Sequence, residues 1–339
     1  MQIEEHVLLA PYTTFGIGGF AHYFVRVENV EELQKSLDFA RDQNQPVLIL
    51  GGGSNMLVPD AGWNGLVLKI ELHGLCIGDD EYDANKKILV AGAGELWDTV
   101  VAQAVEYNLW GLENLSGIPG TVGGAVVQNI GAYGAALSQT LLWAEALDIE
   151  SGEIKKMSNA ECAFGYRESF FKHDTGRYVV VRAAFTLSSA LKPNVSYKDL
   201  AARFGATKPD LSAIRAAVLS IRKAKFPDLT VEGTAGSFFK NPIIPIAEAE
   251  ALKARYPDMP LFDMPEIEGV KVPLAWLLDK VLNLKGVSVG GARLYEKQPL
   301  VIAAEKNTPA NDVRMLAQKI KKEVREKLHI EIEEEVKII

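Results

Sequence analysis

The feature that most constrains this chain is a glycine-rich stretch near its middle, with six glycines between residues 117 and 134. It begins Ser-Gly-Ile-Pro-Gly-Thr-Val-Gly-Gly-Ala at residue 116 and continues Gln-Asn-Ile-Gly-Ala-Tyr-Gly from residue 128. Glycine lets the backbone turn through positive φ and brings bare N–H groups against a neighbour. The stretch therefore predicts a long ligand-facing loop rather than a regular helix or strand.

A second glycine loop, at residues 51–55, directly follows the apolar run 47–50, which predicts a buried strand. Successive N–H groups in such turns form a concave anion site, suited to a pyrophosphate that no lysine needs to neutralise. One triple glycine would indicate only a tight turn, but two loops that also carry Ser, Thr and Asn favour ligand binding. The G-x-x-x-x-G-K-[ST] pattern of an ATP-hydrolysing P-loop is missing from the sequence.

Two shorter glycine patterns match a Rossmann motif in letters but not in context. Residues 16–21 fit G-x-G-x-x-A, yet residues 22–27 have a strand pattern where that motif requires a helix. Residues 92–94 lie between a predicted strand and a predicted helix, but Trp97 occupies the third small position, and Glu113 falls in a loop. We interpret both patterns as turns, and a Rossmann domain is the less favoured alternative.

The remaining pattern mixes helices and strands. Periodicity predicts helices over residues 30–44, 96–107, 211–225, 274–282 and 309–328. It predicts strands over residues 47–50, 66–70, 88–91, 144–150, 178–187 and 330–338, and short helices at most in the proline-punctuated segment 242–273. Because strands and helices do not alternate strictly, the predicted fold class is α+β. At 339 residues we expect two or three domains.

Composition narrows the class of ligand and partner. The formal net charge of −8 argues against a general nucleic-acid binder, although a few basic side chains in a cleft can hold a small anion. No histidine or cysteine pair has ligand spacing, so we predict no metal, and we expect Cys76 and Cys162 to be buried free thiols. The acidic N-terminus and the short apolar runs predict a cytoplasmic protein without membrane insertion.

Several blocks that keep their order along nearly the whole chain resemble the UDP-N-acetylenolpyruvoylglucosamine reductase family, flavoenzymes of bacterial peptidoglycan precursor synthesis. The matching blocks are residues 13–19, which lack the usual asparagine, and residues 51–55, 117–134, 164–169 and 236–242. Any one block would be a weak match. Their combination is highly specific.

The resemblance implies an FAD-binding domain of the vanillyl-alcohol-oxidase/p-cresol-methylhydroxylase type, built from two α+β subdomains, with a smaller α+β substrate-binding domain. Residues 1–72, with a C-terminal strand at 329–339 returning to them, and residues 73–226 would form the two subdomains. Residues 227–328 would bind the substrate. The resemblance further implies non-covalent FAD, NADPH as reductant, and conversion of UDP-N-acetylglucosamine enolpyruvate to UDP-N-acetylmuramate by a protein that we expect to be a monomer.

The family's chemistry, carried over to this sequence, gives roles to three residues. A hydride from the flavin and a proton are added across an enol-ether double bond, and the intermediate charge must spread onto a carboxylate. Arg167 is the candidate cation for that carboxylate. Glu335 is the second group, and it would have to be protonated, which requires a desolvated or anionic environment. Ser237 would deliver the proton, its conjugate base being stabilised by neighbours such as Lys240 or water.

The chain departs from the family pattern at its end. The usual Glu-Pro-Glu-Val stands here as Glu-Glu-Glu-Val at residues 333–336, without the proline. Glu333 is therefore the alternative to Glu335.

The resemblance implies two sets of binding residues. The candidates for FAD are Gly51, Gly52, Gly53, Ser54, Asn55, Ile118, Pro119, Gly120, Thr121, Gly123, Gly124, Asn129, Gly131, Ala132, Tyr133, Gly134 and Tyr166. The candidates for the substrate are Tyr197, Arg222, Lys225, Lys240, Asn241 and Gln298. Residues 195–200 resemble the longer subtype, in which an extra loop covers the substrate with a tyrosine, here Tyr197.

Two other functions stay open at this point. One is an FAD-dependent oxidase or dehydrogenase of the same fold acting on an alcohol or hydroxy acid. Many such enzymes attach flavin through histidine or cysteine, and neither glycine loop holds either residue. The other is a catalytically inactive nucleotide-binding or regulatory module, in which Arg167, Ser237 and Glu335 would be dispensable.

Overall fold

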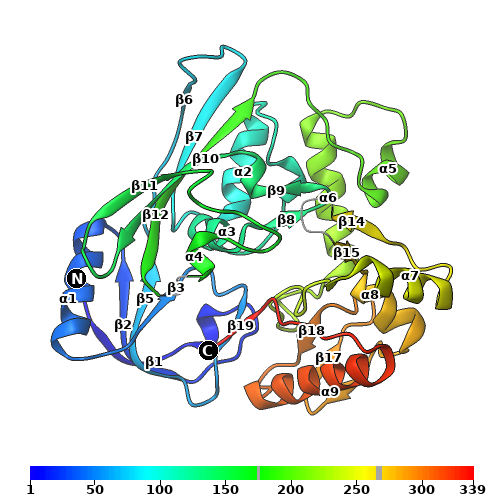
Figure 1. The fold of residues 1–339 in the computed structure, drawn as a ribbon. Coiled ribbons are helices and arrows are strands. Elements are labelled where there is room, and N and C mark those ends of the chain that lie inside the picture. The colour runs from blue at the N-terminus through cyan, green and yellow to red at the C-terminus, as the bar shows by residue number, and fades with distance from the viewer. Residues whose placement is uncertain (174–175, 265–268) are drawn as a thin grey trace. The chain divides into compact units, whose positions relative to one another are not determined.

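The chain divides into two compact units in a computed structural model that describes residues 1–173, 176–264 and 269–339. The first unit comprises residues 1–7, 20–53 and 63–224, and the second comprises residues 8–19, 54–62 and 225–339. Figure 1 gives the order of the elements along the chain. The predicted substrate-binding segment 227–328 lies within the second unit, together with residues 8–19 and 54–62.

A four-stranded sheet opens the first unit, in the order β1-β2-β5-β3. Its strands are β1 (Glu4–Leu8), β2 (Phe20–Val27), β3 (Val47–Leu50) and β5 (Trp63–Ile70). β5 pairs in parallel with both β2 and β3. Helix α1 (Val30–Asp42) starts at Asn29, whose side chain accepts a hydrogen bond from the Glu32 N–H, and its Leu33 and Leu37 are buried in the core.

A five-stranded antiparallel sheet follows, in the order β11-β10-β12-β7-β6. Its strands are β6 (Leu75–Asp79), β7 (Lys86–Gly92), β10 (Leu141–Asp148), β11 (Ile154–Ser158) and β12 (Tyr178–Ser188). Helices α2 (Trp97–Glu106) and α3 (Val122–Gln128) belong to the same core. The fully buried Trp97 meets Phe185 of β12 edge-on, with ring centroids 5.7 Å apart.

The first unit is completed by short elements and one long helix. These are the hairpin β8 (Gly131–Ala132) and β9 (Ala135–Ala136), helices α4 (Phe170–His173) and α5 (Lys198–Phe204), and α6 (Leu211–Lys225), whose last residue starts the second unit. The apolar face of α6 forms a small core with Trp110, Tyr133 and Leu200. Helix α6 therefore packs beside the glycine-rich loop.

The second unit is built on short sheets and the long helix α9 (Ala310–Leu328). Its strands are β4 (Met56–Leu57), β13 (Ile243–Ile244), β14 (Phe262–Met264), β15 (Gly269–Lys271), β16 (Ser288–Val289), β17 (Ala292–Leu294), β18 (Ile302–Ala304) and β19 (Lys337–Ile338). Its other helices are α7 (Ile246–Arg255) and α8 (Leu274–Trp276), the latter continued by a π-helical turn, Leu277–Val281. The parallel pair β4 and β19 joins residues 56–57 to the C-terminus.

Most predicted elements are confirmed, and several expectations were wrong. The alternating run 330–338 forms a strand only at β19, because Ile330, Ile332 and Val336 alternate by burial in the core without a continuous partner strand. Segment 242–273 holds a three-stranded sheet and the ten-residue helix α7 rather than short helices alone. Both cysteines are free thiols, but Cys76 is exposed.

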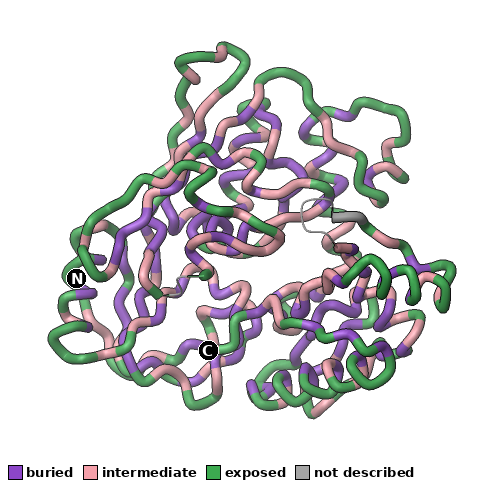
Figure 2. The backbone as a smooth tube through the Cα atoms, in the orientation of Figure 1, coloured by how far each residue is buried: buried purple, intermediate pink, exposed green. Residues whose placement is uncertain are grey.

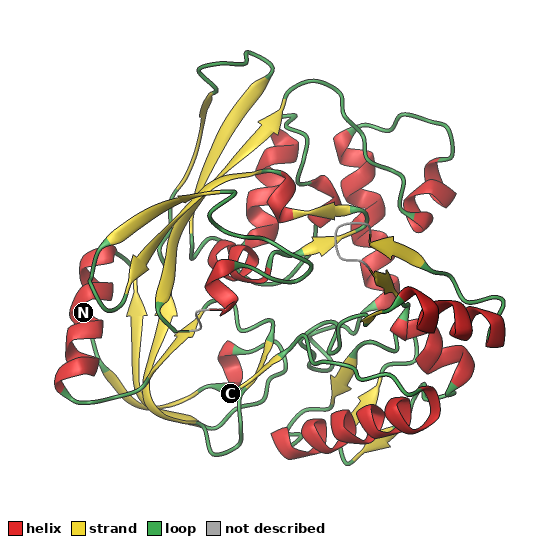
Figure 3. Cartoon of the chain, in the orientation of Figure 1, coloured by secondary structure: helices red, strands yellow, loops and turns green. Residues whose placement is uncertain are grey.

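Burial follows the strands and the inner helix faces, as Figure 2 shows, and Figure 3 shows helices and strands interspersed along the chain. The predicted α+β class is therefore confirmed. Across the described residues, no helix combines the length and apolar character that crossing a membrane requires.

Neighbouring residues of α9 provide a test of the second unit's core. Leu316 is fully buried, whereas Met315 is 49% exposed. We expect Leu316→Ala to lower the free energy of unfolding by about 2–5 kcal/mol, because it removes buried methyl groups and leaves a cavity. Met315→Ala on the same helix should change it by less than about 0.5 kcal/mol. Urea unfolding of both variants measures the difference, and equal losses would contradict the assigned helix face.

Candidate functional site

The two predicted glycine loops lie against each other in the first unit. A Cβ atom added at Gly52 would lie 2.5 Å from the Gly120 Cα, and one added at Gly51 would lie 2.8 Å from the Thr121 Oγ1. Real Cβ atoms essentially never approach so closely, so the contact requires glycine. The structure thus brings residues 51–53 and 120–124 together as one backbone-lined surface.

Thr121 supplies a polar group to this surface. Its hydroxyl is buried and has no hydrogen-bond partner among the residues that the structure describes. A buried hydroxyl left without a partner costs free energy, which a bound ligand with an acceptor or donor would recover. A glycine cradle with such a hydroxyl fits a phosphate-bearing ligand such as FAD.

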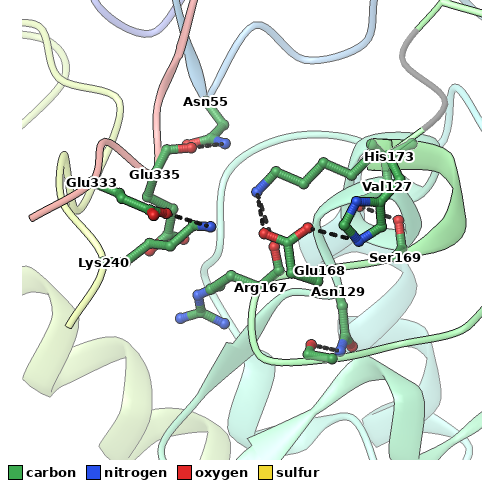
Figure 4. Close-up of polar contacts among 12 residues, drawn as sticks. Asn55, Val127, Asn129, Arg167, Glu168, Ser169, His173, Lys240, Glu333 and Glu335 are labelled. Atoms are coloured by element: carbon green, nitrogen blue, oxygen red, sulfur yellow. Dashed lines mark hydrogen bonds and ion pairs between the residues drawn. The ribbon is translucent and has the colours of Figure 1, made fainter. Parts of the chain in front are cut away.

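Arg167 is held beside the later part of the glycine-rich loop, within the same unit. Its guanidinium Nη2 donates to the Gly131 carbonyl at 2.6 Å, and its backbone adopts the left-handed region at φ 58°. The turn that carries it is anchored by the Asn129 amide, which donates to the Gly165 carbonyl at 2.8 Å, and by the Ser169 hydroxyl, which donates to the Val127 carbonyl at 2.6 Å (Figure 4). Residues at the end of α3 therefore hold the turn that carries Arg167, and the Gly131 carbonyl orients its guanidinium.

Tyr133 contacts two other predicted ligand residues, Arg222 and Tyr197. It is buried, and this burial raises the pKa of its hydroxyl to about 12. The Arg222 guanidinium is hydrogen-bonded to that hydroxyl, and the Tyr197 ring meets the Tyr133 ring edge-on at 5.4 Å. The Asn114 amide donates to the Tyr133 carbonyl at 2.7 Å and to the Asn194 carbonyl at 2.9 Å. The loop that bears Tyr197 is thus tied to the glycine-rich loop.

A second group of predicted residues meets in the second unit. The Phe238 N–H donates to the Leu300 carbonyl at 2.6 Å, and the Phe238 carbonyl accepts from the Glu335 N–H at 2.8 Å. These bonds place the segment that carries Ser237 and Lys240 between residues 298–301 and 333–336. Ser237, Lys240 and the C-terminal glutamates therefore lie on neighbouring backbone segments.

The C-terminal glutamates differ in their surroundings. Glu334 pairs with Lys321 at 2.8 Å, and Glu333 is 78% exposed with the Lys240 Nζ at 3.5 Å. Glu335 is partly buried, and its carbonyl accepts a hydrogen bond from the Asn55 amide at 3.1 Å (Figure 4). Glu335 is therefore the more buried of the two candidate glutamates.

The predicted site residues fall into two sets. The first unit holds Gly51, Gly52, Gly53, Ile118, Pro119, Gly120, Thr121, Gly123, Gly124, Asn129, Gly131, Ala132, Tyr133, Gly134, Tyr166, Arg167, Tyr197 and Arg222. The second unit holds Ser54, Asn55, Lys225, Ser237, Lys240, Asn241, Gln298, Glu333 and Glu335. The Asn241 side-chain oxygen accepts from the Leu274 N–H at 3.0 Å, so it caps the start of α8.

Sequence reasoning missed several residues that support the glycine-rich loop. Asp98 accepts from the Gly117 N–H at 2.6 Å, and Arg215 donates to both Asp98 oxygens at 2.6 and 2.8 Å. Asp98 and Arg215 lie 117 residues apart on separate helices, and no local pattern joins them. Asn114 also gave no signal, because it belongs to no motif in the sequence. In the part of the chain that the structure describes, no cluster of three His, Cys, Asp or Glu side chains could hold a metal ion.

Comparison with known proteins connects this geometry to a family. Residues 21–158 match the FAD binding domain model, and residues 228–339 match the model for the UDP-N-acetylenolpyruvoylglucosamine reductase C-terminal domain. The UDP-N-acetylenolpyruvoylglucosamine reductase of Neisseria gonorrhoeae is 41% identical over 335 residues, covering 96% of this chain and 94% of that protein. The Escherichia coli protein of the same name is 38% identical, with 98% and 95% covered.

A solved structure agrees with these matches. The crystal structure of the UDP-N-acetylenolpyruvylglucosamine reductase from Thermus caldophilus aligns over 100% of this chain and 99% of its own, with a TM-score of 0.69 and 27% identity. The predicted FAD-binding fold with a second α+β domain is therefore confirmed.

The contact between the glycine loops can be tested through flavin content. We expect Gly52→Ala to weaken FAD binding by at least about tenfold, because the added methyl group would collide with the Gly120 backbone. Gly78→Ala is the matched control, since a Cβ at Gly78 meets nothing within 4 Å. Titration of each apoprotein with FAD measures the affinity. Normal binding by Gly52→Ala would show that the loops need not meet.

Proposed function

This chain belongs to the UDP-N-acetylenolpyruvoylglucosamine reductase family, and we propose that it uses NADPH, through FAD, to reduce UDP-N-acetylglucosamine enolpyruvate to UDP-N-acetylmuramate. The observation that carries the proposal is full-length similarity combined with the glycine cradle in its FAD-binding domain. It would act in the cytoplasm, in peptidoglycan precursor synthesis, as a monomer.

The first unit would hold the cofactor. When bound, FAD carries two electrons from the reductant to the substrate as a hydride. The backbone of residues 51–53 and 120–124 and the Thr121 hydroxyl would bind its polar groups, with the neighbouring loop 129–134 and Tyr166 beside them. Residues 1–72 and 73–226 would be the two subdomains of this FAD-binding region, with the end of the chain returning to the first.

Arg167 would bind the substrate carboxylate. Spreading the developing negative charge onto that carboxylate lowers the barrier to addition at the double bond. The hydrogen bond to the Gly131 carbonyl supports this role, because it orients the planar guanidinium. A pre-oriented cation loses little freedom in the transition state.

Ser237 would give the proton to the adjacent carbon. A serine hydroxyl is a weak acid, so its conjugate base needs a nearby positive charge or donor. Lys240 lies on the same pinned segment, which supports this pairing. Glu335 would be the second donor to the substrate carboxylate, and its partial burial beside this segment supports that placement.

The remaining candidates would hold the anionic part of the substrate. Tyr197 would cover it, Arg222 and Lys225 at the end of α6 would meet its charges, and Asn241 and Gln298 would contribute from residues 227–328. An oxidase of the same fold acting on an alcohol or hydroxy acid is the alternative enzyme. The full-length family similarity does not favour it.

Half-reactions measured separately test the proposal. We expect Ser237→Ala to accept electrons from NADPH at close to the normal rate, but to be reoxidised by the enolpyruvate substrate at least about 100-fold more slowly. The physical reason is that only the second step requires the proton. Anaerobic stopped-flow absorbance of the flavin follows both steps.

Ser288→Ala, an exposed serine of β16, is the control and should behave as the parent protein. Normal reoxidation of Ser237→Ala would remove the role given to Ser237. Reoxidation of the parent protein by oxygen or an alcohol-derived carbonyl, but not by the enolpyruvate, would favour the alternative enzyme.

A further inference from the structure

The segment at residues 92–98 begins with the glycine pattern that matches the Rossmann motif in letters. In the structure this segment supports the glycine-rich loop through hydrogen bonds. The Trp97 N–H donates to the Gly120 carbonyl at 3.0 Å, and the Trp97 indole donates to the Leu115 carbonyl at 3.0 Å. In return, the Val122 and Gly123 N–H groups donate to carbonyls of residues 95 and 93, each at 2.9 Å. The glycine-rich loop is therefore held against this segment by main-chain hydrogen bonds donated in both directions and by the indole N–H of Trp97.

Gly117, at the start of the loop, is held differently from the rest. Its backbone has φ +69°, and both polar groups of the residue are engaged by charged side chains. The Asp98 Oδ1 accepts from its N–H at 2.6 Å, and the Arg222 Nε donates to its carbonyl at 2.9 Å. Hydrogen bonds that involve one charged group are about twice as strong as neutral ones, so this residue is fixed more firmly than a glycine in a solvated turn.

The carboxylate that holds Gly117 has its own partner. Arg215 of α6 donates from both terminal nitrogens to both Asp98 oxygens, at 2.6 and 2.8 Å, and its side chain is only 17% exposed. Partial burial alone would raise the pKa of Asp98, but hydrogen bonds from Arg215 and from Gly117 outweigh it and hold the pKa below its ordinary value. Asp98 is therefore a carboxylate at neutral pH, and Arg215 neutralises it.

We propose that Asp98 and Arg215 are positioning residues for FAD: Asp98 fixes the start of the loop, and Arg215 neutralises the charge beneath it. The inference rests on the proposed binding of FAD by this loop. A carboxylate is a good acceptor for the Gly117 N–H, but its charge would repel a nearby pyrophosphate. The bidentate arginine removes the repulsion and keeps the acceptor in place.

Substitutions at Asp98 and Arg215 test separately the acceptor role of Asp98 and the neutralising role of Arg215. We expect Asp98→Ala to raise the Kd for FAD by at least about tenfold, because the Gly117 N–H loses its acceptor. Asp98→Asn keeps an acceptor oxygen and should raise it by about threefold or less. Arg215→Met should raise it by about tenfold at low salt, because the carboxylate charge is then uncompensated.

Two measurements on Arg215→Met distinguish an electrostatic effect on FAD binding from a general loss of structure. Its defect should shrink at high ionic strength, since salt screens the repulsion. It should also be relieved to within about threefold of the parent by adding Asp98→Asn, which removes the charge. Lys223→Met on the exposed side of α6 is the control and should leave the Kd unchanged.

The measurement is fluorescence titration of each apoprotein with FAD, together with the thermal unfolding midpoint of the apoprotein. The proposal is overturned if Asp98→Ala binds FAD as tightly as the parent, or if the Arg215→Met defect ignores salt and the second substitution. An apoprotein of the parent sequence that binds no FAD would overturn the proposed function as well. If the parent protein and Asp98→Ala bind FAD with the same low Kd, only this inference is overturned and the proposed function stands.

Discussion

The close approach of two backbone segments at Gly52 and Gly120 is the constraint on which the arrangement of the first unit depends. Because no side chain fits between the loops at Gly52, the surface there consists of main-chain groups and small polar side chains such as Thr121. A surface made of backbone cannot be adjusted by changing rotamers. Its shape has to be set by what lies beneath it, and the residues that support the loops matter as much as those that line them.

That support is supplied unequally along the glycine-rich loop. Its middle pairs with residues 93–97 through main-chain hydrogen bonds, which depend little on side-chain identity. Its start, at Gly117, depends on the charged side chains Asp98 and Arg222. A buried ion loses hydration, so each of these groups requires a partner of its own: Arg215 for Asp98, and the Tyr133 hydroxyl for Arg222. Helix α6 carries both arginines, and it thereby connects the loop to a packed core.

The sequence correctly predicted elements whose residue pattern is complete within one short segment. The bounds of β3 and α6 were predicted correctly, because an apolar run and an amphipathic repeat are complete within each segment. The prediction of a strand over residues 330–338 was wrong. The alternation of Ile330, Ile332 and Val336 reflects their burial and does not show whether a partner strand lies beside them. The glycine loops were recognised, but the Asp98–Arg215 pair was not, because it joins helices that only the tertiary fold brings together.

The end of the chain lacks the proline that the family pattern has before the glutamate. Proline would restrict the backbone before the glutamate that we propose as catalytic, and here hydrogen bonds restrict the backbone at that glutamate. The Glu335 N–H donates to the Phe238 carbonyl, and the Asn55 amide donates to the Glu335 carbonyl. These bonds fix the backbone at Glu335 from two segments distant in sequence. The Glu333 carbonyl also accepts a hydrogen bond from the Lys240 N–H, but the Glu333 side chain is 78% exposed. The two backbone hydrogen bonds and the partial burial of Glu335 distinguish it from Glu333.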